Sequence, residues 1–356
     1  MSRKNKSTTK DVADLAGVSQ STVSMILNNK VNASFSQETI QNVLEAARSL
    51  DYKVKEKNES ILDIQSQLIA VISPTLSNPY YSTLIQTIEN EASIQGYSLF
   101  ICNTYHDQQI EKKYLDLLSH SAICGIIYTY MPFHKEIVKA ISLKTPVVII
   151  GDKNQAIDID TVELNSIESG VIMGEHLLSL GHKNIAFIST PLSENSVPRI
   201  RRLEGIKLAL NASKAKTNLI IREAEVDVAA DNYNVNLESK IGYEIALDII
   251  EKEDVTALVG VNDMVAYGIF DALSEKKFKV PEDYSVCGFD NIFPSAFSGV
   301  SLTTVDHFIN YKGKDAFEIL FKKINNKSLV LNPTSIFKVE YKPILIKRSS
   351  TGISRK

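Results

Sequence analysis

Short apolar runs recur along the chain from about residue 68 onward, and they constrain the fold more than any other feature. Each run is five or six residues long and rich in β-branched side chains, and most are separated from the next by a stretch with helical periodicity. The runs occupy residues 68–73, 98–102, 123–128, 146–150, 184–189, 256–261 and 284–288. Buried strands that alternate with helices predict parallel, doubly wound sheets.

The number of runs exceeds what one compact sheet typically needs, and a glycine-rich helix start near Gly170 and Gly174 falls midway along them. We therefore predict an α/β body of two doubly wound subdomains that face each other across a cleft. We expect the two subdomains to comprise residues 68–163 plus 292–325 and residues 164–291 plus 326–351. Ligands of such sheets bind beyond the carboxyl ends of the strands, so the loops that follow strands are the candidate site.

Polar and aromatic residues follow five of the predicted strands. These segments are SNPYY (77–81), NTYHD (103–107), TYMPF (129–133), NDM (262–264) and DN (290–291). Aromatic rings can cover the apolar faces of a sugar, while planar polar groups pair with its hydroxyls. Asn, Asp and Pro are also common in turns, so any one of these residues could instead serve the loop that carries it.

The N-terminal segment differs from the body in charge and in periodicity. Residues 1–57 carry a net charge of +3 and the remainder of the chain carries −6, as expected when only the head meets a polyanion. Apolar spacing predicts helices over 10–16, from Ser19 to about Asn28, and from near Ser36. Thr8 is placed to cap the first helix, and a turn at Gly17 makes the first two helices a helix-turn-helix.

The second of these helices has two distinct faces at about 100° per residue. One face gathers Thr22, Val23, Ile26 and Leu27, and the other gathers Gln20, Ser21, Ser24, Met25 and Asn28. The second face has amides and hydroxyls but no carboxylate, so it can enter a major groove and contact phosphates and base edges. The alternative is a plain solvated face, which usually carries Lys and Glu.

The stretch TTKDVADLAGVSQSTVSMILNN resembles the DNA-binding head of the lactose-repressor/galactose-repressor (LacI/GalR) family. The resemblance implies that Gln20, Ser21 and Met25 read bases. Residues expected to hold the DNA backbone are Thr9, Ser19, Thr22, Ser24, Asn28 and Ser36. Arginine is usual at the position of Met25 and would bind guanine in a bidentate manner, whereas methionine can offer only apolar contact.

A polar linker follows the head, and we place a hinge at residues 58–67 between a DNA-binding domain (1–57) and an effector and dimerisation domain (68–356). In the family this hinge forms a short helix that inserts into the minor groove. Ile61 occupies the position of the inserted leucine, but Glu59 places a carboxylate where the groove potential is negative. We expect affinity to rest more on the heads and on lysines, Lys55 among them, that contact phosphate.

The body resembles the family as well, in segments such as LNSIESGVIMGEHLLSLGHKNIAFIS and VPEDYSVCGFDN, and so looks like a type I periplasmic binding protein. Carried over by position, the expected effector contacts are Asn78, Tyr80, Tyr81, Asn103, Tyr128, Arg202, Asn262 and Asp290. Arg202 and Asp290 stand out because a charge in a cleft needs a partner or a ligand. The alternative is that these two residues pair with each other across an empty cleft.

The resemblance implies a ligand-controlled repressor that binds double-stranded operator DNA as a homodimer, with a sugar-like effector and a carbohydrate-use operon as its target. A non-sugar effector or a partner protein is the alternative. An enzyme is disfavoured because the sequence has no phosphate-binding P-loop, no G-x-S-x-G and no G-x-G-x-x-G after a strand. A transporter's solute-binding protein is disfavoured by the DNA-reading head.

The remaining composition limits cofactors and location. The three cysteines are widely spaced and the six histidines show no paired ligand spacing, so we expect no disulfide framework, no metal and no cofactor. No apolar run approaches the roughly 20 residues of a membrane helix, and no apolar segment follows the basic N-terminus. We therefore expect a cytoplasmic protein without a membrane partner.

Overall fold

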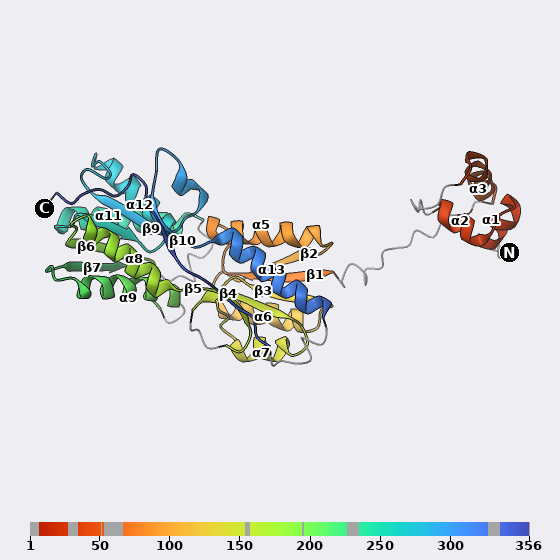
Figure 1. Ribbon diagram of the computed structural model, residues 1–356, viewed down its shortest axis with the longest axis horizontal. Helices are drawn as coiled ribbons and strands as arrows, with labels where there is room; N and C mark the ends of the chain where they lie inside the picture. The colour runs from red at the N-terminus through yellow and green to blue at the C-terminus, as the bar shows by residue number, and fades with distance from the viewer. Residues whose placement is uncertain are drawn as a thin grey trace. The chain divides into compact units, whose positions relative to one another are not determined.

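A computed structural model describes residues 7–27, 35–50, 52, 67–153, 157–193, 196–225, 235–326 and 335–355. The chain divides into two compact units, residues 1–64 and 65–356 (Figure 1). No described helix has the length and apolar character needed to cross a membrane.

The N-terminal unit contains the three predicted helices, α1 (Thr9–Ala16), α2 (Gln20–Leu27) and α3 (Gln37–Ser49). Thr8 and Asp11 form a reciprocal capping box at the start of α1, and Gly17 ends the helix in a left-handed conformation with φ of 67°. The Ser19 hydroxyl accepts the Thr22 amide at the start of α2. A small core closes the unit with Val12, Ala13, Val23, Val43, Ala46 and Ala47.

The body contains two six-stranded sheets within its described residues, and the predicted two-subdomain α/β architecture is confirmed. The first sheet has the order β11 (Lys338–Tyr341), β5 (Asp160–Leu164), β4 (Val147–Asp152), β3 (Gly125–Tyr128), β1 (Leu68–Ser73), β2 (Ser98–Asn103). The second has the order β12 (Ile344–Ile346), β10 (Thr303–Asp306), β9 (Ser285–Asp290), β8 (Ala257–Gly260), β6 (Asn184–Ser189), β7 (Asn218–Glu223). All pairings are parallel except β10 with β12.

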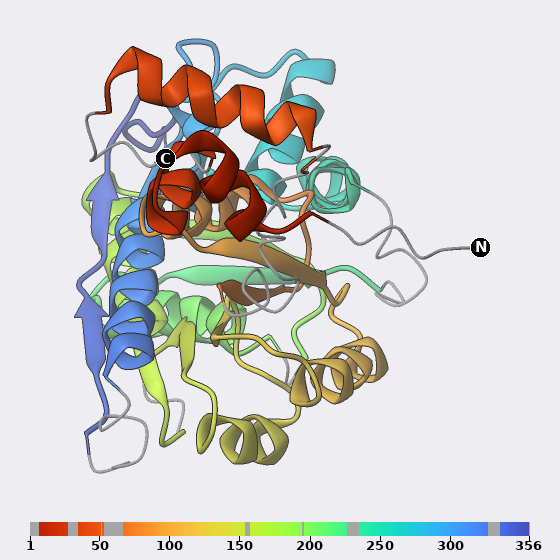
Figure 2. The ribbon, with the colours of Figure 1, turned by 90° about the vertical axis from the view of Figure 1, so that its right-hand side faces the viewer.

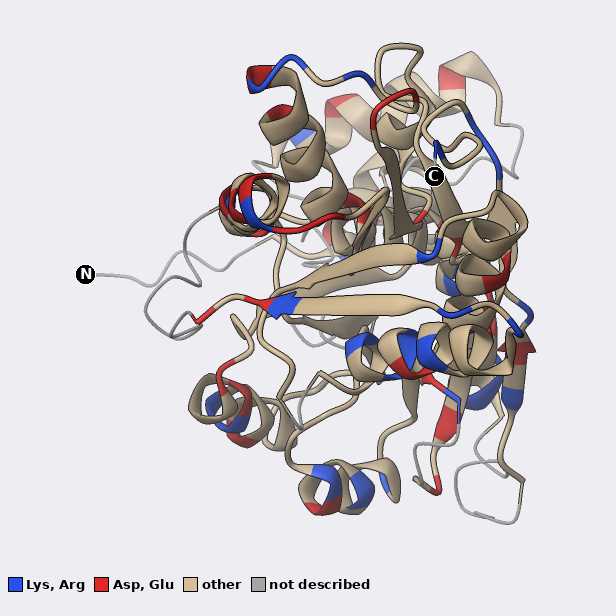
Figure 3. Cartoon of the chain, turned by 90° about the vertical axis from the view of Figure 1, so that its left-hand side faces the viewer, with Lys and Arg blue, Asp and Glu red and all other residues tan. Residues whose placement is uncertain are grey.

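Helices cover both faces of each sheet. In the first subdomain they are α5 (Pro79–Ile94), α6 (Gln108–Ser119), α7 (Lys135–Ser142) and α13 (Ile309–Asn325). In the second they are α8 (Ser166–Ser179), α9 (Val197–Ala212), α11 (Leu237–Lys252), α12 (Asp263–Glu275) and the short η1 (Phe293–Ala296). Side chains of α5 and α13 share one core with the first sheet, and those of α6 and α7 share another. Charged residues of both signs lie on the helices, whereas the central strands are mostly uncharged (Figure 3).

The chain passes between the sheets three times, after β5, β10 and β11. This order corrects the predicted subdomain boundaries. We expected residues 292–325 in the first subdomain; α13 does pack there, but β10 pairs with β9 in the second sheet. We expected residues 326–351 in the second; β12 does pair with β10 there, but β11 pairs with β5 in the first sheet. Figure 2 shows β11 and β12, the darkest blue strands, following one another along one side of the body.

Helices α8 and α9 pack unusually closely through Gly170 and Gly205. A Cβ atom on Gly170 would lie 2.0 Å from the Arg202 carbonyl oxygen, and one on Gly205 would lie 2.0 Å from the Ile167 carbonyl oxygen. Only glycine permits this approach of two backbones. The contact fixes the position of α9, the helix that carries Arg199, Arg201 and Arg202.

Candidate functional site

A cavity of about 250 Å³ lies between the two subdomains of the body. It is bordered by loops that follow the carboxyl ends of strands in both sheets, as the topology rule for such sheets requires. Its polar and aromatic lining comprises Asn78, Tyr80, Tyr81, His106, Tyr130, Phe133, Asp152, Arg199, Arg202, Glu238, Asn262, Asp290, His307 and Lys312, among others.

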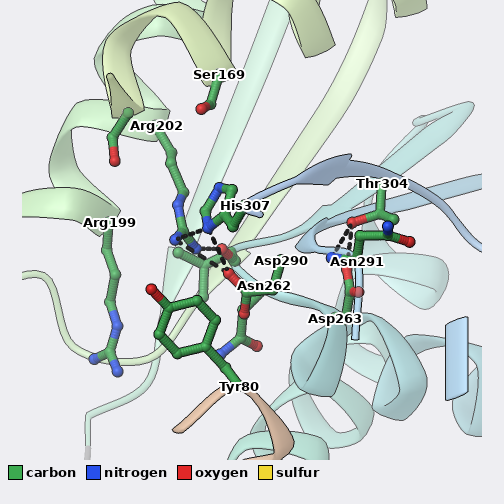
Figure 4. Close-up of polar contacts among 12 residues, drawn as sticks. Tyr80, Ser169, Arg199, Arg202, Asn262, Asp263, Asp290, Asn291, Thr304 and His307 are labelled. Atoms are coloured by element: carbon green, nitrogen blue, oxygen red, sulfur yellow. Dashed lines mark hydrogen bonds and ion pairs between the residues drawn. The ribbon is translucent and has the colours of Figure 1, made fainter. Parts of the chain in front are cut away.

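Arg202, Asp290 and His307 form the centre of the cavity lining (Figure 4). The Arg202 guanidinium lies 3.3 Å from Asp290 Oδ1, and its Nη1 donates to the Val261 carbonyl oxygen at 2.6 Å. His307 Nδ1 lies 3.0 Å from the same Asp290 oxygen. Burial opposes the charge of Asp290, but Arg202 and His307 outweigh it and lower the pKa of this carboxyl. Burial lowers the pKa of His307 to about 4, so the imidazole is neutral at pH 7.

The backbone at Asp290 is strained, with φ of 118°, and Asn291 follows with φ of 55°. A second buried carboxylate, Asp263, supports this turn by accepting the Ile292 amide at 3.1 Å and the Thr304 hydroxyl at 2.6 Å. Burial and the neighbouring Asp290 raise the pKa of Asp263 to about 7. The turn therefore holds the Asp290 carboxylate at a defined place in the cavity.

Glu238 joins the two subdomains on one side of the cavity. Asn78 Nδ2 donates to one of its carboxylate oxygens at 2.6 Å, and Asn262 Nδ2 donates to the other at 2.8 Å. Arg199 lies 3.6 Å from the same carboxylate. Asn78 and Asn262 also cap α5 and α12 with their side-chain oxygens, so the rigid helix ends hold both amides in place.

An aromatic wall made of His106, Tyr130 and Phe133 borders the cavity in the first subdomain. The rings make edge-to-face contacts with centroids 5.5 to 6.4 Å apart. Behind them the buried Glu111 accepts the Tyr130 hydroxyl at 2.6 Å and the His134 amide at 3.0 Å. Burial lowers the pKa of His106 to about 3, so this ring is also neutral.

Six of the eight predicted effector contacts line the cavity, namely Asn78, Tyr80, Tyr81, Arg202, Asn262 and Asp290. The prediction for Tyr128 is wrong, because its side chain is fully buried in the core beneath the sheet. The prediction for Asn103 is also not supported, since this residue does not line the cavity and its Oδ1 accepts the Tyr105 amide at 3.3 Å. Arg202 and Asp290 do pair with each other, but both belong to the second subdomain, so the pair does not cross the cleft as the alternative expected.

Glu238, His307 and Lys312 line the cavity but were not predicted from the sequence. Glu238 and Lys312 lie on helices, and His307 lies on the passage from β10 to α13, so none follows a strand that the apolar runs predicted. Lys312 did leave a signal. It occupies the buried stripe of α13 together with Ile309, Ala316 and Leu320, where an apolar residue is expected.

On the N-terminal unit, α2 presents the predicted polar face to solvent. Gln20, Ser21, Ser24 and Met25 are exposed. On the opposite face Val23 is buried, and Thr22, Ile26 and Leu27 are half-buried. The hydroxyls of Ser19 and Thr22 lie 2.9 Å apart, and Thr9 Oγ1 lies 2.8 Å from the Tyr52 hydroxyl. Ser36 caps α3. The predicted contacts Asn28, Lys55 and Ile61 lie outside the described residues, as does most of the hinge.

A helix-turn-helix head on a body of the type I periplasmic-binding-protein architecture defines a class of ligand-controlled DNA-binding proteins. Residues 8–54 match the family described as bacterial regulatory proteins, lacI family. Residues 66–341 match the family described as periplasmic binding proteins and sugar binding domain of the LacI family. The chain belongs to the LacI family of DNA-binding repressors and has that family's ligand-binding domain.

Three similar proteins illustrate this membership. The HTH-type transcriptional repressor PurR of Mannheimia succiniciproducens is 32% identical over 325 residues, which cover 90% of this chain and 92% of that protein. The ribose-bound LacI family regulator of Enterococcus faecium has a TM-score of 0.67 and 25% identity, over 81% of this chain and all of that one. The lac repressor dimer bound to operator and the anti-inducer ONPF shares the fold, with a TM-score of 0.71 and 23% identity over 98% of this chain and all of that one.

Proposed function

We propose that this protein is a homodimeric repressor whose hold on operator DNA is controlled by a small, sugar-like molecule bound in the cavity between the subdomains. The observation that carries the proposal is the convergence of Arg202, Asp290 and the aromatic wall on one cavity. Rings that cover apolar faces, beside planar polar groups that pair with hydroxyls, suit a polyhydroxylated ligand. The ribose bound to the Enterococcus faecium regulator supports the same ligand class.

The effector would act by population shift. Arg202 and Asp290 belong to the second subdomain, whereas Tyr80 and the aromatic wall belong to the first. A ligand that contacts both groups favours one relative orientation of the subdomains, and it can shift the equilibrium only by its differential affinity for the two orientations. In a dimer, that shift changes how well two heads fit two half-sites.

The exposed face of α2 would read the operator. Two heads are needed because a single short recognition helix buries too little surface for tight, specific binding. A protein that binds operator DNA in a bacterium must be in the compartment that holds the DNA, so we place this protein in the cytoplasm. A non-sugar effector remains the second candidate, because the PurR proteins among its relatives match nearly the whole chain.

Fluorescence anisotropy with labelled duplexes from the region upstream of its own gene tests the proposal. We expect tight binding by the wild-type chain and a loss of roughly tenfold or more for each of Gln20→Ala and Ser21→Ala. Gln41→Ala is the matched control, since Gln41 is exposed on α3 and its side-chain amide donates to Glu45 of the same helix at 3.2 Å. If the wild-type chain binds no such duplex in the presence or absence of a sugar panel, the repressor proposal is wrong.

A further inference from the structure

Lys312 is a buried cation in the cavity lining. Its side chain comes from α13, its residue is 2% exposed, and it borders the same cavity as Arg202 and Asp290. Lys312 Nζ donates to the Tyr80 hydroxyl at 2.7 Å and lies 5.0 Å from the centre of the Tyr80 ring. Within the described part of the chain, the Lys312 ammonium makes no other side-chain hydrogen bond and no ion pair with a carboxylate.

The acidic groups around the cavity are already paired. Three of the described lining residues are carboxylates, and each lies beside an arginine of α9. Asp290 lies 3.3 Å from Arg202, Asp152 lies 3.0 Å from Arg201, and Glu238 lies 3.6 Å from Arg199. Lys312 is therefore the one cation of this described set without its own carboxylate.

Other groups in the lining also lack partners. Arg202 Nε and His307 Nε2 are buried and have no hydrogen-bond partner among the described residues. The ammonium of Lys312 has three N–H groups, of which the Tyr80 hydroxyl takes one. Buried polar groups are normally satisfied, so unpaired groups that border one cavity indicate an absent ligand.

From this arrangement we infer that the effector carries an anionic group, a phosphate or a carboxylate, which binds to Lys312 beside Arg202. The Lys312 ammonium has no carboxylate at ion-pair distance among the described residues, and a buried ammonium without a close counter-ion is costly, so this position calls for a negative charge on the ligand. Burial lowers the pKa of Lys312 to about 8, so most of the ammonium is still protonated at pH 7 and able to bind an anion. The inference rests on the proposed role of the cavity as the effector site and narrows it to acidic sugars, such as sugar phosphates or sugar acids.

Inorganic phosphate is the first probe, added to the full chain at pH 7 against sodium chloride of matched ionic strength. We expect phosphate to raise the Tm by roughly 2 °C at several times its dissociation constant. The rise should disappear in Lys312→Met, which keeps a long, unbranched side chain but removes its charge. It should persist in Lys312→Arg and in the control Lys314→Met, since Lys314 lies on the same helix with its side chain 52% exposed.

The inference is overturned if phosphate stabilises the wild-type chain no more than chloride does, a result that needs no variant. It is also overturned if Lys312→Met keeps the full rise. Ribose, ribose 5-phosphate and ribonate then separate the sources of the anion, with at least a tenfold preference expected for one acidic form over ribose. Equal stabilisation of wild-type and Lys312→Met by neutral ribose would leave the effector cavity intact and refute only the anionic group.

Discussion

The substitution Gly170→Ala should reveal how strongly the cavity depends on the contact between α8 and α9. The new methyl group would lie 2.0 Å from the Arg202 carbonyl oxygen and 2.9 Å from Gly205 Cα. Both atoms belong to the backbone of α9, so no flexible side chain can move aside. The helices must separate, and Arg202 must move with its helix.

The size of the effect follows from the distances. Real Cβ atoms essentially never approach a heavy atom more closely than 3.0 Å, so the 2.0 Å contact requires a local separation of about 1 Å. Over-packing of this kind costs about 1–3 kcal/mol, and a backbone clash belongs at the upper end of that range. We therefore expect the free energy of unfolding to fall by about 3 kcal/mol and the Tm to fall by roughly 5–10 °C.

Urea and thermal unfolding of the full chain would measure this change. Gly299→Ala is the matched control, because a Cβ atom there would meet nothing within 4 Å and its φ is not positive. We expect this control to stay within about 0.5 kcal/mol of wild type. A Gly170→Ala variant that is equally close to wild type would refute the close approach of the two helices.

Three further predictions concern the other parts of the molecule. Met25→Arg should create a bidentate contact to guanine and favour operators with guanine at one base pair by about 1–3 kcal/mol, measured by anisotropy on duplexes that differ at single pairs. Glu111→Ala should lower the free energy of unfolding by about 3 kcal/mol, because the Tyr130 hydroxyl and the His134 amide lose their acceptor, whereas the exposed Glu136→Ala should change little. Burial lowers the pKa of Lys312 to about 8 in the folded chain, so above pH 8 the unfolded chain binds more protons at this residue. The free energy of unfolding of wild type should therefore rise relative to that of Lys312→Met between pH 8 and 10. Parallel curves of unfolding free energy against pH for the two proteins would contradict the buried ammonium.

Local sequence patterns predicted the central strands well. The run 68–73 coincides with β1 and the run 184–189 coincides with β6, because buried parallel strands are continuous apolar segments. The strand β5 was missed although it is fully buried, since Asp160 and Glu163 interrupt its apolar pattern. Asp160 is compensated by Lys323 at 2.6 Å, a contact from α13 that no local pattern could show.

Edge strands and the order of the last elements were harder to predict. The strand β11 alternates between exposed and half-buried residues, and β12 is three residues long. The alternating polar residues of β11 and the shortness of the apolar β12 keep both strands from standing out in the sequence. The three passages between the sheets were expected, but the second and third were placed before β10 and β11 instead of after them.

The site was predictable where it depends on strand ends and not where it depends on helices. Asp290 ends β9, so the topology rule alone placed it in the cavity. Tyr128 ends β3 in the same way, but side chains alternate between the faces of a strand and this one lies in the core. The contribution of Lys312 required knowledge of where α13 packs, which long-range topology decides.

The positions of the cavity residues along the chain give the proposed mechanism its physical basis. Asp152 accepts the Ser166 amide at 2.9 Å beside the first passage between the sheets, and it also pairs with Arg201 of the second subdomain. His307 lies on the second passage itself, between β10 and α13. A ligand bound between Lys312 and Arg202 would thus contact or adjoin segments that connect the two subdomains. Even a small preference of these side chains for one geometry would bias the relative orientation of the two subdomains, which is the quantity an effector must change.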